Sequence, residues 1–347
     1  MSIKDFMFSF MISSLFFSLL FIPTLVTRPI NSTKFFQIIS SNNISQSLNT
    51  YPVKFAYLIS ASKGDLNRLK RALVALYHPN NYYLLHMDQS APKTEHQSLA
   101  KYVSSDPVFT QVDLIHAFSD LPRDLNFVQH SGHLGWKLSK RGKPIIIDPG
   151  LYNINKSEIW WVIKQRALPT AFKLYTGSAW TILSRSFTEY CIWGYDNLPR
   201  TLLLYYTNFV SSPEGYFQTL ICNSEDYKNT TVNHDFHYIT WDIPPKQHPR
   251  PLGLKDYRRM VLSNAPFARK FKQNDPVLAK VDHELLRRRK GKFAYGGWCS
   301  KSGGEDGACS RLSDDLGVLK PGPGSRRLKA LLTKMLSERN FRRRQCR

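Results

Sequence analysis

The sequence is poor in acidic residues and in cysteine, and it contains no internal repeat. Asp and Glu number 26 against 48 Lys and Arg, which gives a net charge of +22. A chain this basic predicts an anionic partner, and nucleic acid, a membrane surface, a polyanionic glycan and a nucleotide diphosphate all satisfy that condition. None of the five cysteines is spaced as CxxC, which argues against a zinc ribbon. They allow one or two disulfides in an oxidising compartment, with one thiol left over.

One long run, residues 6–26, lacks charge, within a chain whose 42% hydrophobic content suits a globular core. Its length is about what a helix needs to cross roughly 30 Å of hydrocarbon. We expect a cytosolic tail at 1–5, a transmembrane signal anchor at 6–26, a lumenal stem at 27–50 and a folded lumenal domain at 51–347. A cleaved signal peptide is the alternative, but the run is long for that and no small-x-small cleavage site follows. Four Asn-x-Ser/Thr sequons support the lumenal side: Asn31, Asn43, Asn155 and Asn229.

The folded part opens with a strand–helix–strand pattern. Residues 53–62 (VKFAYLISAS) form a short apolar run typical of a buried parallel strand, and residues 82–92 (YYLLHMDQSAP) contain a second. Between them, leucines recur at a helical period that ends at Pro79: Leu66, Leu69, Leu73 and Leu76. This βαβ unit predicts an α/β fold with a parallel sheet.

Polar residues stand at the ends of both predicted strands. Ser60 ends the first strand and Asp88 ends the second. Because ligands bind at the carboxyl ends of strands in open α/β sheets, both are candidates for nucleotide contact. Asp88 could hold a ribose hydroxyl or a base edge. The alternative is a turn, since Asp-Gln-Ser-Ala-Pro has good turn chemistry.

A single carboxylate, Glu214, lies in SSPEGYFQTLICN, just before an apolar helical run. One interpretation is a helix start, with Ser212 as cap, Pro213 in the first turn and Glu214 favoured by the helix dipole. It explains Gly215 poorly, because glycine within a helix costs about 0.5–1 kcal/mol relative to alanine. The other interpretation is a catalytic base beside a glycine that lets a substrate approach the backbone closely.

Two further groups of side chains admit both a functional and a purely structural explanation. His234, Asp235 and His237 could suggest a metal site. On a strand, however, Asp235 and His237 share a face while His234 points away, so we expect no metal there. Trp180 and Trp241 could stack on sugar rings, although tryptophans in protein cores are common.

Two basic segments follow these tryptophans. The proline-rich segment PPKQHPRP carries Lys246 and Arg250, and FARKFK carries Lys270. Fixed cations could neutralise a leaving diphosphate without a metal ion. The alternative is a solvated surface face.

Several segments together resemble one family. They run in order from about Tyr51 to Cys346 and include FAYLISASKGDLNRLKRALVALYHPNNYYLLHMDQSAP, KPIIIDPGLY, TGSAWTILSR, NFVSSPEGYFQTLICN, TTVNHDFHYITWD and NAPFARKF. On these motifs the chain resembles the core-2/I-branching glycosyltransferases, and in particular their plant β-glucuronosyltransferase branch that acts on arabinogalactan. The resemblance implies an open α/β nucleotide-sugar-binding fold of the metal-independent type. It also implies a Golgi type II membrane enzyme that inverts the anomeric carbon and needs no cofactor.

The resemblance further implies roles for individual residues. They are Glu214 as general base; Lys270, helped by Lys246 or Arg250, at the UDP diphosphate; Ser60 and Asp88 against uridine; and Trp241, Trp180, Gly177 and Ser178 at the acceptor. The donor would be UDP-glucuronic acid or a related UDP-sugar, and the acceptor a galactan chain of arabinogalactan. A nucleic-acid partner would rest on charge alone and conflicts with the anchor and the sequons.

One departure from the family pattern lies at residues 109–111, where Phe109 runs directly into Thr110 and Gln111. Family members carry several dozen further residues here, which supply strands and helices of the nucleotide domain. We therefore expect the fold to be incomplete between the first βαβ unit and the acceptor half. Two functions remain open: an active transferase, or a catalytically inactive truncated or splice form that binds glycan or a partner transferase.

Overall fold

The computed structural model describes residues 37–39, 54–76, 81–105, 114, 117–152, 154–155, 158–246, 248–286, 293–294, 298–299 and 322–346. The described residues divide into two compact units. Described residues up to 105 belong to the N-terminal unit and those from 114 onward to the C-terminal unit. The anchor predicted at residues 6–26 lies outside the described residues. Within them, no helix combines the length and the apolar character that a membrane crossing requires.

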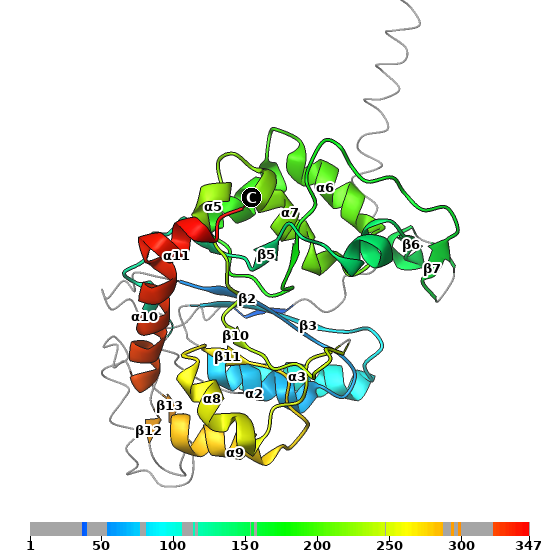
Figure 1. Ribbon diagram of the computed structural model, residues 1–347. Coiled ribbons are helices and arrows are strands. Elements are labelled where there is room, and N and C mark those ends of the chain that lie inside the picture. The colour runs from blue at the N-terminus through cyan, green and yellow to red at the C-terminus, as the bar shows by residue number, and fades with distance from the viewer. Residues whose placement is uncertain are drawn as a thin grey trace, which may run out of the picture. The chain divides into compact units, whose positions relative to one another are not determined.

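The N-terminal unit confirms the predicted strand–helix–strand pattern (Figure 1). Strand β2 (Ala56–Ala61) pairs in parallel with β3 (Tyr82–Met87), and α2 (Leu66–Leu76) connects them. A short strand from the range predicted as stem, β1 (Gln37–Ile39), pairs antiparallel with the other side of β3. Helix α3 (Lys93–Ser105) follows the sheet.

The core of this unit lies between its helices and one face of the sheet. Alternate residues of β3 are buried, and they pack against the leucine face of α2 and against α3; the buried set is Leu69, Leu73, Tyr83, Leu85, Met87, Ala91 and Leu99. Alternation places Leu58 on the opposite face, where its side chain is 69% exposed. The buried leucines of α2 are therefore those that the helical period predicts.

The C-terminal unit is built from short elements. Its helical segments are η1 (Leu138–Gly142), η2 (Pro149–Leu151), α5 (Arg185–Trp193), α6 (Leu198–Thr207), η3 (Ser212–Glu214), α7 (Tyr216–Asn223), η4 (Lys228–Thr230), η5 (Leu254–Asp256), α8 (Tyr257–Leu262), α9 (Pro276–Lys280), η6 (Val281–Leu285), α10 (Pro323–Leu336) and α11 (Glu338–Arg343). Its parallel strand pairs are β4 (Asn126–Phe127) with β9 (Thr231–Val232) and β10 (His237–Tyr238) with β11 (Phe267–Ala268). Its antiparallel pairs are β5 (His130–Ser131) with β8 (Thr176–Gly177), β6 (Ile145–Ile147) with β7 (Trp160–Val162), and β12 (Phe293–Ala294) with β13 (Trp298–Cys299).

Helices α5, α6 and α7 share the main core of this unit. Its buried members are Val128, Leu174, Tyr175, Phe187, Leu202, Tyr206, Phe209, Leu220, Ile221 and Cys222. Helix α5 begins where Ser184 Oγ accepts a hydrogen bond from the N–H of Phe187 at 3.1 Å, and it ends before Gly194. A smaller core of Leu252, Met260 and Val277 lies among η5, α8 and α9. The mixed helix and strand content agrees with the predicted α/β class.

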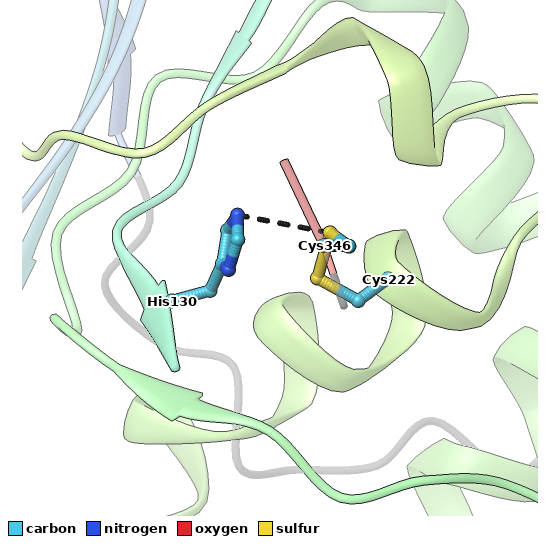
Figure 2. A group of neighbouring side chains, drawn as sticks. All are labelled: His130, Cys222 and Cys346. Atoms are coloured by element: carbon cyan, nitrogen blue, oxygen red, sulfur yellow. Dashed lines mark hydrogen bonds between the residues drawn. A yellow bond between two sulfur atoms is a disulfide. The ribbon is translucent and has the colours of Figure 1, made fainter. Parts of the chain in front are cut away.

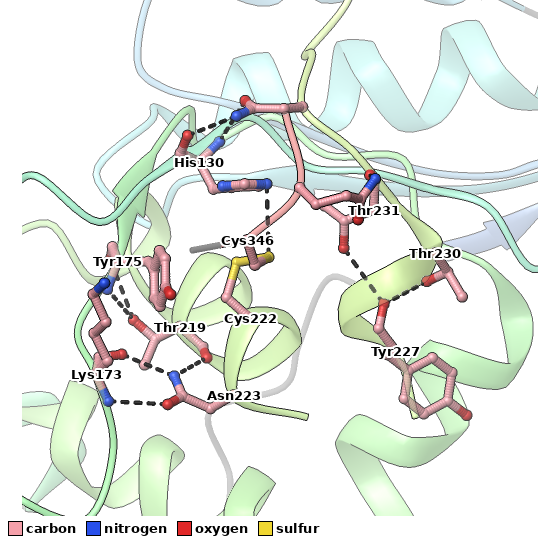
Figure 3. The surroundings of a disulfide bond; sticks show 12 residues. His130, Lys173, Tyr175, Thr219, Cys222, Asn223, Tyr227, Thr230, Thr231 and Cys346 are labelled. Carbon is pink, nitrogen blue, oxygen red and sulfur yellow. Dashed lines mark hydrogen bonds between the residues drawn. A yellow bond between two sulfur atoms is a disulfide. The ribbon is translucent and has the colours of Figure 1, made fainter. Parts of the chain in front are cut away.

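A disulfide joins Cys222, near the end of α7, to Cys346 at a sequence separation of 124. His130 Nε2 lies 3.7 Å from Sγ of Cys346 (Figure 2). Asn223 fixes the same end of α7, because its side chain accepts from the N–H of Lys173 at 2.9 Å and donates to the Lys173 carbonyl at 2.8 Å (Figure 3). The helix that follows Glu214 is thus covalently tied to the C-terminal end of the chain.

Candidate active site

Glu214 ends η3, the short turn between α6 and α7. Its N–H donates to the Ser211 carbonyl at 3.0 Å, and its own carbonyl accepts from Thr176 Oγ1 at 3.1 Å. Pro213 lies in the first turn, as the sequence predicts, but the prediction of Ser212 as the cap is wrong: Ser211 precedes the turn, Ser212 is its first residue, and no side chain caps it. Its last residue presents a carboxylate whose partners come from other parts of the chain.

Two cations converge on this carboxylate. Oε2 of Glu214 accepts from Nη1 of Arg141 at 2.5 Å and from Nζ of Lys137 at 3.2 Å. The side chains of Glu214, Arg141 and Lys137 are 31%, 19% and 24% exposed. Because the cluster is partly buried, salt screens it less than a pair on the surface. A helix-dipole role alone does not require such partners.

The same cations set the protonation state of Glu214. Burial raises the pKa of this carboxyl, but the hydrogen bonds and charges of Arg141 and Lys137 lower it and outweigh burial. The pKa of Glu214 therefore lies below its ordinary value, and the carboxylate is ionised at neutral pH. That is the form that a general base requires.

Ser211 contacts the other carboxylate oxygen from a strained backbone position. Its hydroxyl donates to Oε1 of Glu214 at 3.2 Å. Its φ of 60° lies in the left-handed region, which costs a residue with a Cβ about 1–2 kcal/mol. Strain of this kind is found at functional sites, and here it lies at a residue that touches the candidate base.

Gly215 is explained by packing within the protein. A Cβ at this position would lie 2.6 Å from Cε1 and 2.8 Å from Oη of Tyr206. Tyr206 is buried, and its hydroxyl lies 2.6 Å from Oγ1 of Thr219. The glycine therefore makes room for the ring of Tyr206, and the interpretation that it makes room for a substrate is not needed.

Gly177 and Ser178, predicted at the acceptor, lie against the helix that follows Glu214. The carbonyl of Ser178 accepts from Nε2 of Gln218 on α7 at 2.5 Å. A Cβ on Gly177 would lie 1.7 Å from the Gln129 carbonyl oxygen, so no side chain fits there. The glycine allows β8 to approach this backbone closely, which is a structural reason independent of any acceptor.

Trp180 is covered by a cation. Cζ of Arg269 lies 3.6 Å from the centroid of the Trp180 ring, and the His237 ring lies 5.3 Å from it. Such a cation–π contact stabilises by about 0.5–2 kcal/mol, and it fixes Arg269 directly before Lys270. Trp180 remains 44% exposed and Trp241 is 49% exposed.

The cations predicted at the diphosphate differ in their partners. Arg250 donates to Oδ2 and Oδ1 of the buried Asp256 at 2.9 and 2.7 Å. This bidentate bond is the main cause that lowers the pKa of Asp256 to about 2. Lys246 is 77% exposed and lies 3.9 Å from a carboxylate oxygen of Asp242. Lys270 is exposed and takes part in none of the ion pairs between described residues, so its charge is available to a ligand.

Replacing Arg250 by alanine should destabilise the fold. A pKa of about 2 for Asp256 against an ordinary 3.8 corresponds to roughly 2 kcal/mol. This contribution is present above the unfolded-state pKa and is lost as pH falls through the folded-state value. Because the N–H of Gly253 also lowers this pKa and remains in the variant, we expect Arg250→Ala to lower the free energy of unfolding in urea by about 1–2 kcal/mol at pH 7, with the difference shrinking below about pH 4. Lys246→Ala is the matched control, and equal stability of the two variants would contradict the structural role.

The residues predicted to face uridine belong to the N-terminal unit. Ser60 lies in β2 opposite His86, and Asp88 directly follows β3. Oδ1 of Asp88 accepts from the N–H of Ser90 at 2.8 Å, a bond that lowers the pKa of Asp88. The turn that we considered as the alternative for Asp88 is present, and its contact with a nucleotide stays a prediction.

The predicted glycosylation sites differ in what the structure describes. Asn155 and Asn229 are both exposed, which modification requires. Asn31 and Asn43 lie outside the described residues. Glycosylation itself stays a prediction at all four positions.

The histidines near β10 do not converge on a point. Nδ1 of His234 accepts from the N–H of Phe236 at 2.8 Å, while His237 Nδ1 lies 3.6 Å from Oδ2 of Asp235. Among the described residues, the ligand atoms that do gather are those of His130, Cys222 and Cys346, all within 4.8 Å of one another. Both sulfurs are bonded to each other (Figure 2), so the oxidised protein offers only the His130 imidazole. Burial lowers the pKa of His130 to about 4, which keeps this ring neutral.

Sequence reasoning missed Lys137 and Arg141. They lie 77 and 73 residues from Glu214 along the chain. Their spacing of four in WKLSKRGK is compatible with one helical face and was the available signal. A basic run more often marks a solvated face, and nothing local links it to a distant carboxylate.

Comparison with known proteins gives one family match and several similar sequences. The model of the Core-2/I-Branching enzyme family matches residues 55–106 and 103–261. Beta-glucuronosyltransferase GlcAT14A of Arabidopsis thaliana is 45% identical over 412 aligned positions, which cover 98% of this chain and 92% of that protein. Beta-glucuronosyltransferase GlcAT14B of the same plant is 47% identical, covering 85% of this chain and 80% of its own length. Human xylosyltransferase 2 is 23% identical over 69% of this chain and 34% of its own length.

Proposed function

Because this chain belongs to the Core-2/I-branching enzyme family and is a glycosyltransferase, we propose that it transfers glucuronic acid from UDP-glucuronic acid to β-galactan chains of arabinogalactan proteins. Two similar proteins of Arabidopsis thaliana are named beta-glucuronosyltransferases, which supports the choice of donor sugar. The observation that carries the mechanism is the Glu214 cluster, an ionised and partly buried carboxylate held by two cations.

A single displacement accounts for the reaction. Glu214 accepts the proton of an acceptor hydroxyl, whose oxygen forms a bond to the anomeric carbon as the bond from that carbon to UDP breaks. The bonding electrons leave with the diphosphate, and fixed cations stabilise the charge that develops there. The configuration at the anomeric carbon is inverted.

The leaving group is stabilised by side chains in this proposal, which needs no metal cofactor. Lys270 is exposed and has no carboxylate partner among the described residues, so it is the first candidate. Arg269 precedes it and is held on the ring of Trp180. Of the two loop cations, Lys246 is the better helper, because Arg250 is bound to Asp256.

The remaining contacts in this proposal are those that the family resemblance implies. Ser60 and Asp88 contact uridine, and the exposed ring of Trp241 lines the acceptor together with the segment from Gly177. We place the enzyme in the Golgi membrane as a type II protein, anchored by residues 6–26 with its catalytic part in the lumen. The disulfide between Cys222 and Cys346 supports an oxidising compartment, and the exposed sequon Asn229 is compatible with it.

A panel of donors tests the proposed reaction. The purified chain is incubated with β-galactan oligosaccharides and with UDP-glucuronic acid, UDP-N-acetylglucosamine or UDP-xylose in separate reactions. We expect transfer from UDP-glucuronic acid at a rate at least about tenfold above the other donors, since a carboxylate recognised by a charged group separates them by more than about 1.4 kcal/mol. Products should carry a β-linked sugar by NMR. Preference for another donor, or an α-linked product, would overturn the assignment.

A second candidate function is favoured by one observation. The family match is divided at residues 103–106, and the alignment with GlcAT14A has 412 positions although this chain has 347 residues. The division of the family match supports a missing segment near residues 109–111, and the longer alignment supports a missing segment without placing it. A form that lacks part of its donor site would bind glycan or a partner transferase without catalysis. Calorimetry with UDP-glucuronic acid separates the two functions, because the inactive form should give no binding heat while the active form should bind.

A further inference from the structure

The two oxygens of the Glu214 carboxylate have different surroundings. Oε2 accepts from both Arg141 and Lys137. Oε1 accepts from the hydroxyl of Ser211, a neutral donor that can rotate away, at the longer distance of 3.2 Å. A proton that approaches Oε2 would meet two fixed positive charges, whereas the described contacts of Oε1 include no cation. The carboxylate is therefore asymmetric before any substrate binds.

We propose that Arg141 and Lys137 are positioning residues for Glu214: they fix the carboxylate through Oε2, so that Oε1 receives the proton of the acceptor hydroxyl. This inference rests on the proposed function, in which Glu214 is the general base. It adds two residues and names the reacting oxygen.

The position of the two cations is well determined by their own contacts. Lys137 precedes η1 and Arg141 lies within it, so a spacing of four residues brings both onto one side of that turn. Nζ of Lys137 also donates to Oγ1 of Thr176 at 3.1 Å, and that hydroxyl donates to the Glu214 carbonyl. These bonds close a ring from Lys137 through Thr176 back to Glu214. The base is held by its backbone and its side chain at once.

Arg141 has a second neighbour. Its Cζ lies 5.4 Å from the centroid of the Trp136 ring, and this ring is 64% exposed. The guanidinium thus has an aromatic contact as well as the carboxylate. With 19% of the Arg141 side chain exposed, its bond to Oε2 is shielded from water, which strengthens it.

The charges that face Glu214 determine the direction of the pH effect. Two of them, Lys137 and Arg141, contact Glu214 directly, and the third is Arg269. Burial lowers the pKa of Arg269, whereas the charges of Asp235 and Glu214 raise it. Burial alone raises the pKa of Glu214. Removing Arg141 takes away the strongest opposing contact, so the pKa of Glu214 should rise. The base would then be protonated, and inactive, over a wider acidic range.

The test compares Arg141→Gln, Arg141→Lys and the control Lys140→Gln in glucuronic acid transfer. Lys140 is the exposed cation beside Arg141 in the same turn. For Arg141→Gln we expect kcat to fall about 10- to 100-fold, as for a base displaced by about 1 Å. The acceptor KM should stay near the wild-type value, and the acidic limb of kcat/KM should move to higher pH. Arg141→Lys should restore part of both effects, and Lys140→Gln should match the wild type.

Three results would overturn the proposal. The first is an Arg141→Gln enzyme with wild-type kcat and pH profile. The second is a rise in acceptor KM for Arg141→Gln at unchanged kcat, which would make Arg141 an acceptor contact. The third is a Lys140→Gln enzyme with the same losses as Arg141→Gln. If the wild type transfers sugar and Glu214→Gln does not, these results refute the positioning role alone. If the wild type does not transfer sugar, or if Glu214→Gln transfers it at the full rate, the proposed function is refuted instead.

A stability measurement tests the same contact without turnover, and so remains possible if a variant is inactive. Urea unfolding of Arg141→Gln, Glu214→Gln and the double variant forms a double-mutant cycle. We expect a smaller loss in the double variant than the sum of the single losses, because Glu214→Gln leaves the Arg141 guanidinium without its carboxylate and Arg141→Gln leaves the carboxylate with Lys137 alone. Additive losses would show that the two side chains do not interact in solution and would refute the proposal. Lys137→Gln with Glu214→Gln gives a second, independent cycle.

Discussion

Loss of the disulfide between Cys222 and Cys346 should lower the free energy of unfolding by about 3–5 kcal/mol, because the bond closes a large loop of the unfolded chain. The two cysteines are separated by 124 residues, and the entropy that a cross-link removes from the unfolded state grows with loop length. Few single changes in a domain of this size would have a larger effect on stability. The measurement is urea unfolding of Cys222→Ala/Cys346→Ser against the wild type.

Two controls isolate the bond from the side chains. Reduction of the wild type with a dithiol should lower its stability to near that of the double variant. Cys191→Ser removes the free thiol found among the described cysteines and should change the stability far less. A double variant as stable as the oxidised wild type would show that the loop is constrained in other ways, for example by the bonds of Asn223 to Lys173 (Figure 3).

Replacing Glu214 by glutamine should lower the rate of transfer by about 10²–10⁴, the typical loss when a positioned general base is removed. Glutamine keeps the size of the side chain and a carbonyl oxygen that can accept from Arg141, but an amide cannot accept the acceptor's proton. The neighbouring α7 depends on Gly215, Tyr206 and Thr219 rather than on the carboxylate, so we expect it to stay folded.

A matched control for Glu214→Gln is Glu189→Gln. Glu189 is an exposed carboxylate on α5, paired with Arg185 at 2.8 Å. Its neutralisation makes the same change in net charge at a position without a catalytic role. A fall in rate that Glu189→Gln shares would point to the overall charge of the chain, and it would count against Glu214 as the base.

Local patterns predicted the N-terminal unit well. The period of Leu66, Leu69 and Leu73 placed α2, and the parallel pairing of β2 with β3 followed from the short connections. These elements are set by contacts between near neighbours. The strand pairs of the C-terminal unit are two or three residues long, and several join distant segments, such as Asn126 with Thr231. No periodicity can appear in strands that short.

The candidate site was predictable only in part. The turn at Ser212–Glu214 could be placed from proline and serine, but the partners of the carboxylate could not, because Lys137 and Arg141 come from a separate turn. The reason for Gly215 also lay elsewhere in the chain, in the ring of Tyr206. A glycine in the sequence indicates that some group approaches the backbone closely, but it does not show which group this is.

The partners of the basic side chains were the hardest feature to predict from the sequence. Arg250 and Lys270 look equivalent in the sequence, yet Arg250 is bound to the buried Asp256 and Lys270 is exposed. Arg269, another cation of the FARKFK segment, is fixed on the ring of Trp180. Which basic side chain serves a ligand depends on which acidic or aromatic group already holds the others.

In the proposed mechanism, Glu214 removes the proton from the acceptor hydroxyl during transfer. This step is tested most directly by single-turnover transfer of radiolabelled glucuronic acid to a β-galactan oligosaccharide, with wild type and Glu214→Gln each saturated with donor. We expect a rate about 10²–10⁴ lower for the variant, with unchanged affinity for UDP. Transfer by Glu214→Gln at the wild-type rate would contradict it.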